Sequence, residues 1–151
     1  MSTPSGRSGE RLTRRRDKVV IDTAVLVSAF AFGGAPAKAI IKAFREAEIY
    51  VSPLLLQEYR ETPVKLEEQG KISHQQMQAL IAGIAAVVSH AKIVYPVEKL
   101  SLCRDSEDDM ILECCHTAKA KILITGDKDL LEIADLPFDL QLMMPQEFVE
   151  D

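Results

Sequence analysis

Four carboxylates in this chain of 151 residues adjoin apolar segments. They are Asp22 in VVIDTAVLVSA, Glu58 in VSPLLLQEYRE, Asp109 in CRDSEDDMILE and Asp127 in KILITGDKDLL. Two carboxylates at about 4 Å in a protein-like dielectric repel each other by roughly 4 kcal/mol. A divalent cation with oxygen ligands offsets that repulsion. If the folded chain brings these four side chains together, the pattern predicts a metal site.

Each acid also has a structural alternative. Asp22 and Asp127 directly follow short apolar runs, where an aspartate often caps the next helix or forms an Asx turn. Glu58 is compatible with a solvated helix face, which Glu61 would share one turn further on. The acids around Asp109 crowd the start of a helix, where the helix dipole favours negative charge. The metal-site prediction therefore depends on the joint placement of the four acids.

Other polar residues close to these acids are expected to support the site. They are Thr125, Asp108, Glu113 and Asp129. Thr125 can hold a carboxylate or a water through its hydroxyl group. Glu113 follows Asp109 by four residues and shares its helix face, where it would either support a water on the metal or be exposed.

Strand and helix patterns alternate along the chain. Short β-branched runs predict strands at 18–22, 48–51, 93–95, 121–125 and 139–143. Helices are predicted at 36–48, 53–60, from 73, at 107–119 and at 128–134, with a helical turn after Pro145. This alternation predicts an α/β fold, a three-layer sandwich in which helices flank a mostly parallel central sheet. Ligands bind such sheets at the carboxyl ends of the strands, where Asp22 and Asp127 are expected.

The helix from Ser73 has the clearest start signal in the chain. Ser73 and Gln76 have the spacing of a capping box, in which each side chain bonds to the other residue's backbone. Its buried face is predicted from helical periodicity to comprise Met77, Leu80, Ile81, Ile84, Val87 and Val88.

The composition is that of a single soluble globular domain, with 47% hydrophobic and 27% charged residues. No stretch approaches the ~20 apolar residues of a membrane span, and no secretory signal is evident. The cysteines number three, an odd count, and none forms a C-x-x-C pair, which argues against a disulfide framework and a zinc ribbon. We expect a cytoplasmic protein.

Three segments resemble the PIN-domain family: VVIDTAVLVSA, SPLLLQEYR and CRDSEDDMILECCHTAKAKILITGDKDLL. The similarity is greatest to the VapC-like toxin components of toxin–antitoxin systems and extends over residues 18–149. The order of the acids (Asp, Glu, Asp, Asp) and the T-G-D-K-D-L segment are together its most specific features.

The resemblance implies an endoribonuclease that uses Mg²⁺ or Mn²⁺ to cleave single-stranded RNA. It implies that Asp22, Glu58, Asp109 and Asp127 are the catalytic, metal-binding acids. Thr125 matches the hydroxyl residue two positions before the last acid. The resemblance further implies a PIN-like nuclease domain at 18–149, a homodimer and a cognate antitoxin as partner, without a membrane.

One position departs from the family pattern. The family usually has asparagine after D-T, whereas this chain has Ala24. Alanine cannot donate the hydrogen bond of an asparagine amide, although all four acids are present. The alternative function is therefore a catalytically weakened PIN-like module that binds RNA or a protein without cutting. Ala24 also argues against a HAD-type phosphatase, which requires a second aspartate at this position.

Charge is distributed unevenly along the chain. Residues 1–18 carry six basic and two acidic side chains, a net charge of +4, and the remaining 12 basic and 21 acidic residues give −9. An acidic body is unlike a purely electrostatic nucleic-acid binder, but it is compatible with a nuclease whose acidic centre is neutralised by metal. The basic leader, residues 1–17, is predicted to be disordered.

Overall fold

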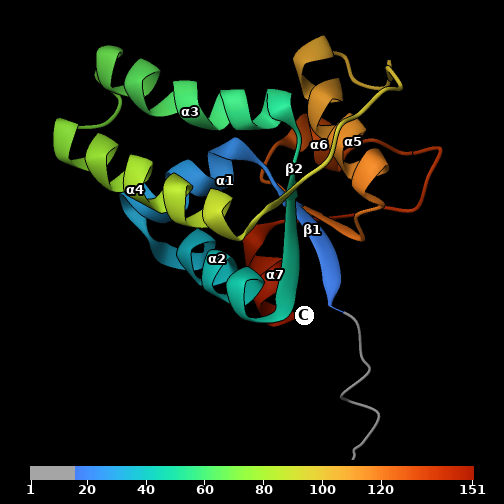
Figure 1. The fold of residues 1–151 in the computed structure, drawn as a ribbon, viewed down its shortest axis with the longest axis horizontal. Coiled ribbons are helices and arrows are strands. Elements are labelled where there is room, and N and C mark those ends of the chain that lie inside the picture. The colour runs from blue at the N-terminus through green and yellow to red at the C-terminus, as the bar shows by residue number, and fades with distance from the viewer. Residues whose placement is uncertain (1–15) are drawn as a thin grey trace, which may run out of the picture.

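Five short parallel strands form the centre of the fold in the computed structural model, which describes residues 16–151 (Figure 1). The strands are β1 (Asp17–Ile21), β2 (Ala47–Val51), β3 (Lys92–Ile93), β4 (Ile122–Ile124) and β5 (Gln141–Met143). They lie in the order β3-β2-β1-β4-β5, and every pair is parallel. β1 is therefore the central strand, and the residue after it lies in the middle of the sheet's carboxyl edge.

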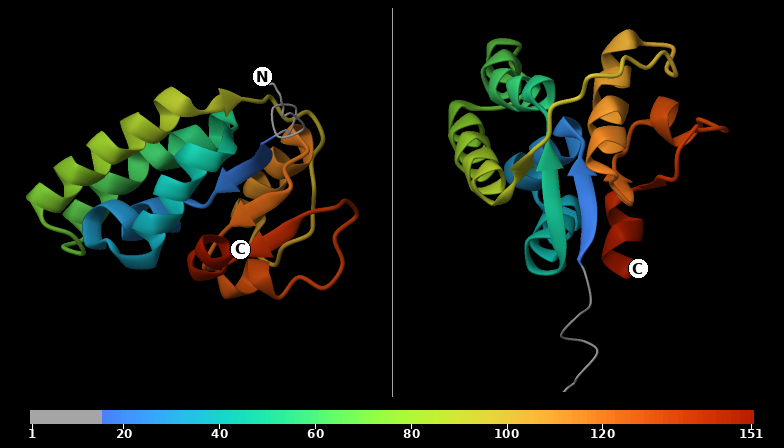
Figure 2. Two further views of the ribbon diagram at one scale, coloured as in Figure 1. Left: turned by 90° about the horizontal axis from the view of Figure 1, so that it is seen from below. Right: turned by 45° about the vertical axis from the view of Figure 1, so that its right-hand side comes forward.

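Helices cover both faces of this sheet (Figure 2). They are α1 (Thr23–Val27), the π-helix η2 (Ser28–Phe32), α2 (Gly34–Glu46), α3 (Pro53–Glu68), α4 (His74–His90), α5 (Ser106–Ala118), α6 (Lys128–Leu131) and α7 (Pro145–Glu150). α5 packs against β1 and β2, and α2 packs against β2 and α7. The predicted three-layer α/β sandwich is confirmed, with a sheet that is parallel throughout the described residues.

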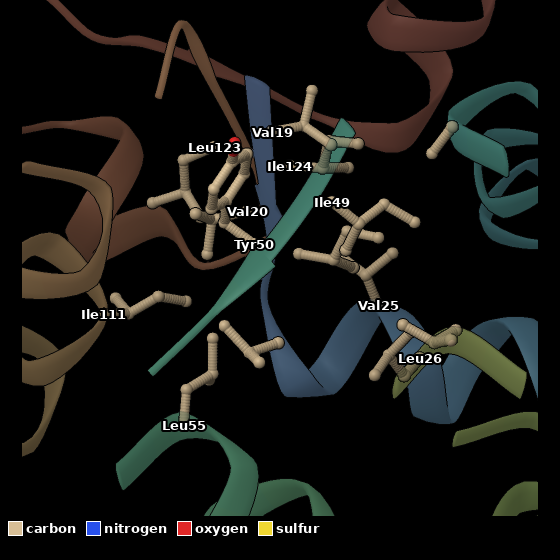
Figure 3. Packing of buried hydrophobic residues seen from close by; sticks show 14 of the residues in the cluster. Val19, Val20, Val25, Leu26, Ile49, Tyr50, Leu55, Ile111, Leu123 and Ile124 are labelled. Carbon is tan, nitrogen blue, oxygen red and sulfur yellow. The ribbon is translucent and has the colours of Figure 1, made fainter. Parts of the chain in front are cut away.

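The core explains why the strand runs are apolar on both faces. Side chains on one face of the sheet pack toward α1, and those on the other pack toward α5 (Figure 3). Val19 and Ile124 lie on the same side of the sheet as Val25, whereas Val20 and Leu123 lie on the same side as Ile111. A strand that is covered on both faces has a continuous hydrophobic sequence, and β1 and β4 both show this pattern.

Residues 23–32 form α1 and η2, which the sequence patterns did not predict. β-branched residues such as Val25 and Val27 have a low helix propensity, so local preference favours other structures. Val25 and Leu26 are nevertheless buried, and their packing against the sheet decides the conformation.

α3 extends to Glu68, well beyond the predicted end at residue 60. Pro63 lies inside the helix, where a proline normally ends it because it lacks an N–H and clashes with the preceding turn. Pro63 is buried, and Thr62 donates from Oγ1 to the Glu58 carbonyl at 2.7 Å. Tertiary packing thus extends α3, which forms a hairpin with α4 (Figure 1).

The capping box of α4 is confirmed. Ser73 Oγ accepts from the Gln76 N–H at 3.0 Å, and Gln76 Oε1 accepts from the Ser73 N–H at 2.9 Å. Leu80, Ile84 and Val87 are buried as predicted. Ile81 is 45% exposed, because it lines an open groove between α3 and α4 rather than the core.

No single helix in residues 16–151 is long and apolar enough to cross a membrane; the bent pair Thr23–Phe32 and Gly34–Glu46 meets that test only when taken together. The predicted disorder of the leader concerns residues that lie almost entirely outside those described.

Candidate active site

Asp22 stands at the carboxyl end of the central strand. Its N–H donates to the Ile124 carbonyl at 3.0 Å, so the β1–β4 pairing continues up to this residue. Asp22 is also the first residue before α1, but its side chain makes no capping hydrogen bond. The Ala24 N–H still lowers the pKa of Asp22, so a weak contact to the start of α1 accompanies its place at the strand end.

Thr125 links Asp22 to Asp127. The Thr125 hydroxyl donates to Asp22 Oδ2 at 2.7 Å and accepts from the Asp127 N–H at 3.0 Å. Thr125 is fully buried and follows β4, the strand beside β1. Because both bonds of this hydroxyl are directional, Thr125 fixes the orientation of the Asp22 carboxylate.

Asp127 has two roles. Its Oδ1 accepts from the Asp129 N–H at 2.9 Å and so caps α6, which is the capping role considered for Asp127 from sequence. It also lines the same cleft as Asp22. Asp129 itself is exposed and contributes its backbone N–H to this cap.

Glu58 reaches the site from α3. The buried Tyr59 donates from its hydroxyl to the Ile21 carbonyl, which ties α3 to the end of β1. The Thr23 hydroxyl donates to Glu58 Oε1. Glu58 is half-buried beside Asp22 rather than on a solvated helix face. Thr23 was not among the predicted site residues, although its place next to Asp22 in the sequence was a usable signal.

The three carboxylates of Asp22, Glu58 and Asp127 line one cleft of about 750 Å³. Burial is the main cause that raises the pKa of Asp22 above its usual value. The hydrogen bond from Thr125 opposes this shift, and the negative charges of Glu58 and Asp127 add to it. The cleft is therefore a place where negative charge is concentrated.

The structure places Asp109 outside this group, contrary to the expectation from sequence. Asp109 is only 6% exposed, and its Oδ1 accepts from the Leu102 and Cys103 N–H groups at 2.8 and 2.9 Å. A carboxylate that satisfies two backbone donors holds the loop before α5. Asp109 thus has a structural role, because its carboxylate accepts hydrogen bonds from this loop.

Asp108 is the acid of α5 that is electrostatically coupled to the cleft. Burial raises its pKa to about 6, and the nearby charges of Asp127, Asp105, Asp22 and Asp129 contribute to the shift. Ile111 follows Asp108 by three positions and Leu112 follows Asp109 by three, so each shares a helix face with one of the acids. Both Ile111 and Leu112 are buried, so both faces of α5 are covered. Helical spacing alone could not distinguish the two acids.

Glu113 is also a loop anchor. It is buried, and its Oε2 accepts from the Leu100 N–H at 2.9 Å. Glu113 is therefore not exposed, and it is not among the residues that line the cleft. Asp109 and Glu113 together fix the segment 100–103 on α5.

A model of the PIN domain family matches residues 18–129, which is most of the chain. The chain belongs to the PIN domain family. Its parallel sheet flanked by helices is the fold that the resemblance implied.

Similar proteins extend over nearly the whole PIN domain. Uncharacterised protein MJ1680 of Methanocaldococcus jannaschii is 29% identical over 151 residues, which cover 94% of this chain and 96% of that protein. The crystal structure of VapBC2 from Rickettsia felis, bound to a DNA fragment from their promoter, has a similar fold. Its TM-score is 0.56 at 15% identity, and the match covers 83% of this chain and 98% of that one.

The donor types in the cleft of this PIN domain suit a hard divalent cation. Mg²⁺ and Mn²⁺ prefer carboxylate oxygens, which Asp22, Glu58 and Asp127 supply in the cleft. Asp108 does not line the cleft, but burial and the charges of Asp127 and Asp22 raise its pKa. The concentration of negative charge around Asp22 is also what a cation would relieve. Within residues 16–151, no three of the Asp, Glu, His and Cys side chains are already close enough together to hold a metal ion. Binding would therefore require these carboxylates to draw closer.

Proposed function

We propose that this PIN domain is an endoribonuclease that cleaves single-stranded RNA with Mg²⁺ or Mn²⁺. The observation that carries the proposal is the convergence of Asp22, Glu58 and Asp127, from three different elements, on one cleft. A purely structural role for each acid would not require them to share a site. Repulsion among them costs folding free energy, which a function at the site explains.

Four acids would hold the cation: Asp22, Glu58, Asp108 and Asp127. Asp108 takes the place that sequence reasoning gave to Asp109, because the Asp109 carboxylate already accepts two backbone hydrogen bonds. A divalent ion in this cleft would supply Lewis-acid stabilisation and an activated water for phosphodiester hydrolysis.

Two threonines would hold the acids in position for this chemistry. Thr125 orients the Asp22 carboxylate, and Thr23 orients that of Glu58. Hydrogen bonds that fix ligand orientation are commonly worth about 10–100-fold in metal affinity or activity.

The lining of the cleft also bears on substrate binding. None of the residues that line it in the described chain is Lys or Arg. The anionic RNA backbone would therefore be repelled by the acids of the cleft until their charge is neutralised. RNA binding at the cleft should depend on the divalent cation.

The biological role that we propose is that of a cytoplasmic toxin in a type II toxin–antitoxin pair. Its support is the VapC-like character of the sequence together with the fold shared with VapBC2. A cognate antitoxin protein and a homodimer belong to this proposal.

A second candidate function is a PIN-like module that binds RNA or a protein without cutting. The observation that favours it is Ala24, which is exposed in the cleft and offers no hydrogen-bonding side chain. This module would keep the fold and the cleft and lack the catalytic rate.

Incubation with mixed-sequence, single-stranded RNA separates the two functions. The nuclease should cut RNA in Mg²⁺ or Mn²⁺, stop in EDTA and leave duplex RNA and single-stranded DNA intact. Binding of RNA without cleavage in any divalent ion would instead favour the non-catalytic module.

A further inference from the structure

Ser28 lines the same cleft as Asp22, Glu58 and Asp127. It is the first residue of η2 and follows Ala24 by four positions in a continuous helical segment. Ala24 and Ser28 therefore share a helix face, and both line the cleft together with Asp22. The position where the family has asparagine and the Ser28 side chain are neighbours.

The other hydroxyl groups around the cleft are already engaged. Thr23 donates to Glu58 Oε1, Thr125 donates to Asp22 Oδ2, and Thr62 donates to the Glu58 carbonyl. A hydroxyl has one proton to donate, so none of these three is free to donate to a substrate. The Ser28 hydroxyl, by contrast, makes no hydrogen bond with another residue in the described part of the chain.

The backbone holds Ser28 in a wide turn. The Gly33 N–H donates to the Ser28 carbonyl at 2.8 Å and to the Ala29 carbonyl at 3.1 Å. Phe30, two residues on, packs closely against Gly83 of α4. π-helical turns of this kind are frequent at functional sites. Ser28 is thus fixed by its main chain and its neighbours, while its side chain remains available.

We propose that the Ser28 hydroxyl binds the sugar–phosphate backbone of the RNA substrate. It would supply the substrate hydrogen bond that Ala24 cannot make. A serine hydroxyl can donate to a phosphate oxygen or pair with a ribose 2′-OH, and both are parts of the same RNA backbone. This inference rests on the proposed nuclease function.

The variant Ser28→Ala tests the contact. Loss of one neutral hydrogen bond should lower kcat/KM for single-stranded RNA by about 5–10-fold. Because Ser28 donates to none of the acids, Mn²⁺ affinity and the melting temperature should stay within error of the wild type. Ser28→Thr, which keeps the hydroxyl, should recover most of the lost kcat/KM. Ser89→Ala is the matched control, since Ser89 bonds to the Ala86 carbonyl on exposed α4.

The affinity for single-stranded DNA of the same sequence, measured in Mn²⁺, identifies the contacted group. If Ser28→Ala binds both DNA and RNA more weakly than the wild type does, the Ser28 hydroxyl contacts a phosphate. If only the affinity for RNA falls, the hydroxyl contacts the 2′-OH. Either result supports the proposal. An unchanged kcat/KM and unchanged affinities in Ser28→Ala overturn it, and so does a loss of Mn²⁺ affinity or melting temperature of the same size.

The same experiment keeps this inference separate from the proposed function. If the wild type cuts RNA and Ser28→Ala cuts equally well, the nuclease assignment stands and the role of Ser28 is refuted. If the wild type does not cut RNA, the nuclease assignment fails, and the Kd for intact RNA then decides on Ser28. An equal Kd for the wild type and Ser28→Ala refutes the contact in that case.

Discussion

Asp108 and Asp109 are adjacent in the chain, but their carboxylates have different surroundings. Asp109 accepts hydrogen bonds from two N–H groups of the loop before α5. The pKa of Asp108, by contrast, is raised by burial and by the negative charges of Asp127 and Asp22. The first arrangement stabilises a loop. The second concentrates negative charge, which a cation can neutralise.

Replacing each acid by its amide should separate these roles. Asp108→Asn should lower metal-dependent RNA cleavage by more than about 100-fold, since even outer-shell partners of metals are worth about 10–100-fold. Asp109→Asn keeps an acceptor oxygen for the Leu102 and Cys103 N–H groups and should cut RNA at a rate within a few fold of the wild type. Initial cleavage rates in Mn²⁺ measure both effects.

Asp109→Leu complements this pair of variants. It leaves two buried N–H groups without an acceptor and should lower the free energy of unfolding by about 1–3 kcal/mol, as measured by urea denaturation. A loss of Mn²⁺ affinity in Asp109→Asn, rather than of stability in Asp109→Leu, would return Asp109 to the metal site.

We expect Ala24 to affect the rate of RNA cleavage rather than metal binding. Ala24→Asn introduces an amide beside Asp22 and Ser28 without removing a carboxylate. RNA cleavage should rise, while Mn²⁺ affinity stays within a few fold. A gel assay follows the cleavage, and calorimetry follows the metal. A variant no faster than the wild type would show that another group, with Ser28 as the first candidate, already supplies the missing contact.

Three of the four proposed metal-binding acids were predictable from sequence, and the reason is local. Asp22 and Asp127 end apolar strands, and parallel strands bring their carboxyl ends to one edge. Glu58 was placed on its helix by the Ser52–Pro53 start signal, confirmed by the Ser52 cap. The choice between Asp108 and Asp109 depends on the rotation of α5 against the sheet, which tertiary packing sets and local spacing does not.

At the scale of the element, the contact between η2 and α4 holds the wall of the cleft. A Cβ built on Gly83 would lie 2.3 Å from Phe30 Cγ, closer than side chains approach in proteins. Gly83 thus permits Phe30, and with it η2, to lie close to α4.

Gly83→Ala should therefore destabilise the protein although alanine favours helices. Overpacking costs about 1–3 kcal/mol, and the helix preference of alanine over glycine returns up to about 1 kcal/mol. Urea denaturation of the two single variants and the double variant Gly83→Ala/Phe30→Leu measures their coupling. The smaller leucine side chain in the double variant should recover part of the loss. A Gly83→Ala protein as stable as the wild type would show that η2 shifts freely.

The elements themselves were predictable where periodicity was strong. The α4 capping box and the apolar strand runs are local signals, and both were confirmed. α1 was missed because its β-branched residues disfavour helix, and α3, which continues through Pro63, was predicted too short. η2, which has no β-branched residue, was missed together with α1. For α1 and α3, burial against the sheet or the hairpin outweighed the local preference.

At the scale of the whole molecule, the acidic cleft should make the metal-free protein sensitive to pH. The pKa values of Asp22 and Asp108 are raised in the folded state, for Asp108 to about 6. Between the unfolded pKa near 4 and these folded values, the native state binds more protons than the unfolded state. For Asp108 this stability is present below about pH 4 and is lost as pH rises through about 6. The raised pKa of Asp22 acts in the same direction.

Denaturation in EDTA at several pH values measures this effect. The free energy of unfolding should fall between about pH 4 and 7 less steeply in Asp108→Asn than in the wild type. Asp135→Asn, which changes an exposed acid, serves as the control and should leave the slope unchanged. A slope that is the same in all three proteins would mean that neither burial nor the neighbouring charges raise the pKa of Asp108.

A metal-dependent nuclease centred on these acids is tested most directly by the rate of single-stranded RNA cleavage in Mn²⁺. The rate is measured for the wild type, Asp22→Asn and Asp135→Asn, purified side by side. Asp22→Asn keeps an oxygen for the Thr125 hydroxyl but removes a charge from the centre of the cleft. We predict that the wild type and Asp135→Asn cut at equal rates and stop in EDTA, and that Asp22→Asn is slower by more than about 100-fold. Equal cleavage by Asp22→Asn and the wild type would contradict a metal-dependent nuclease centred on these acids.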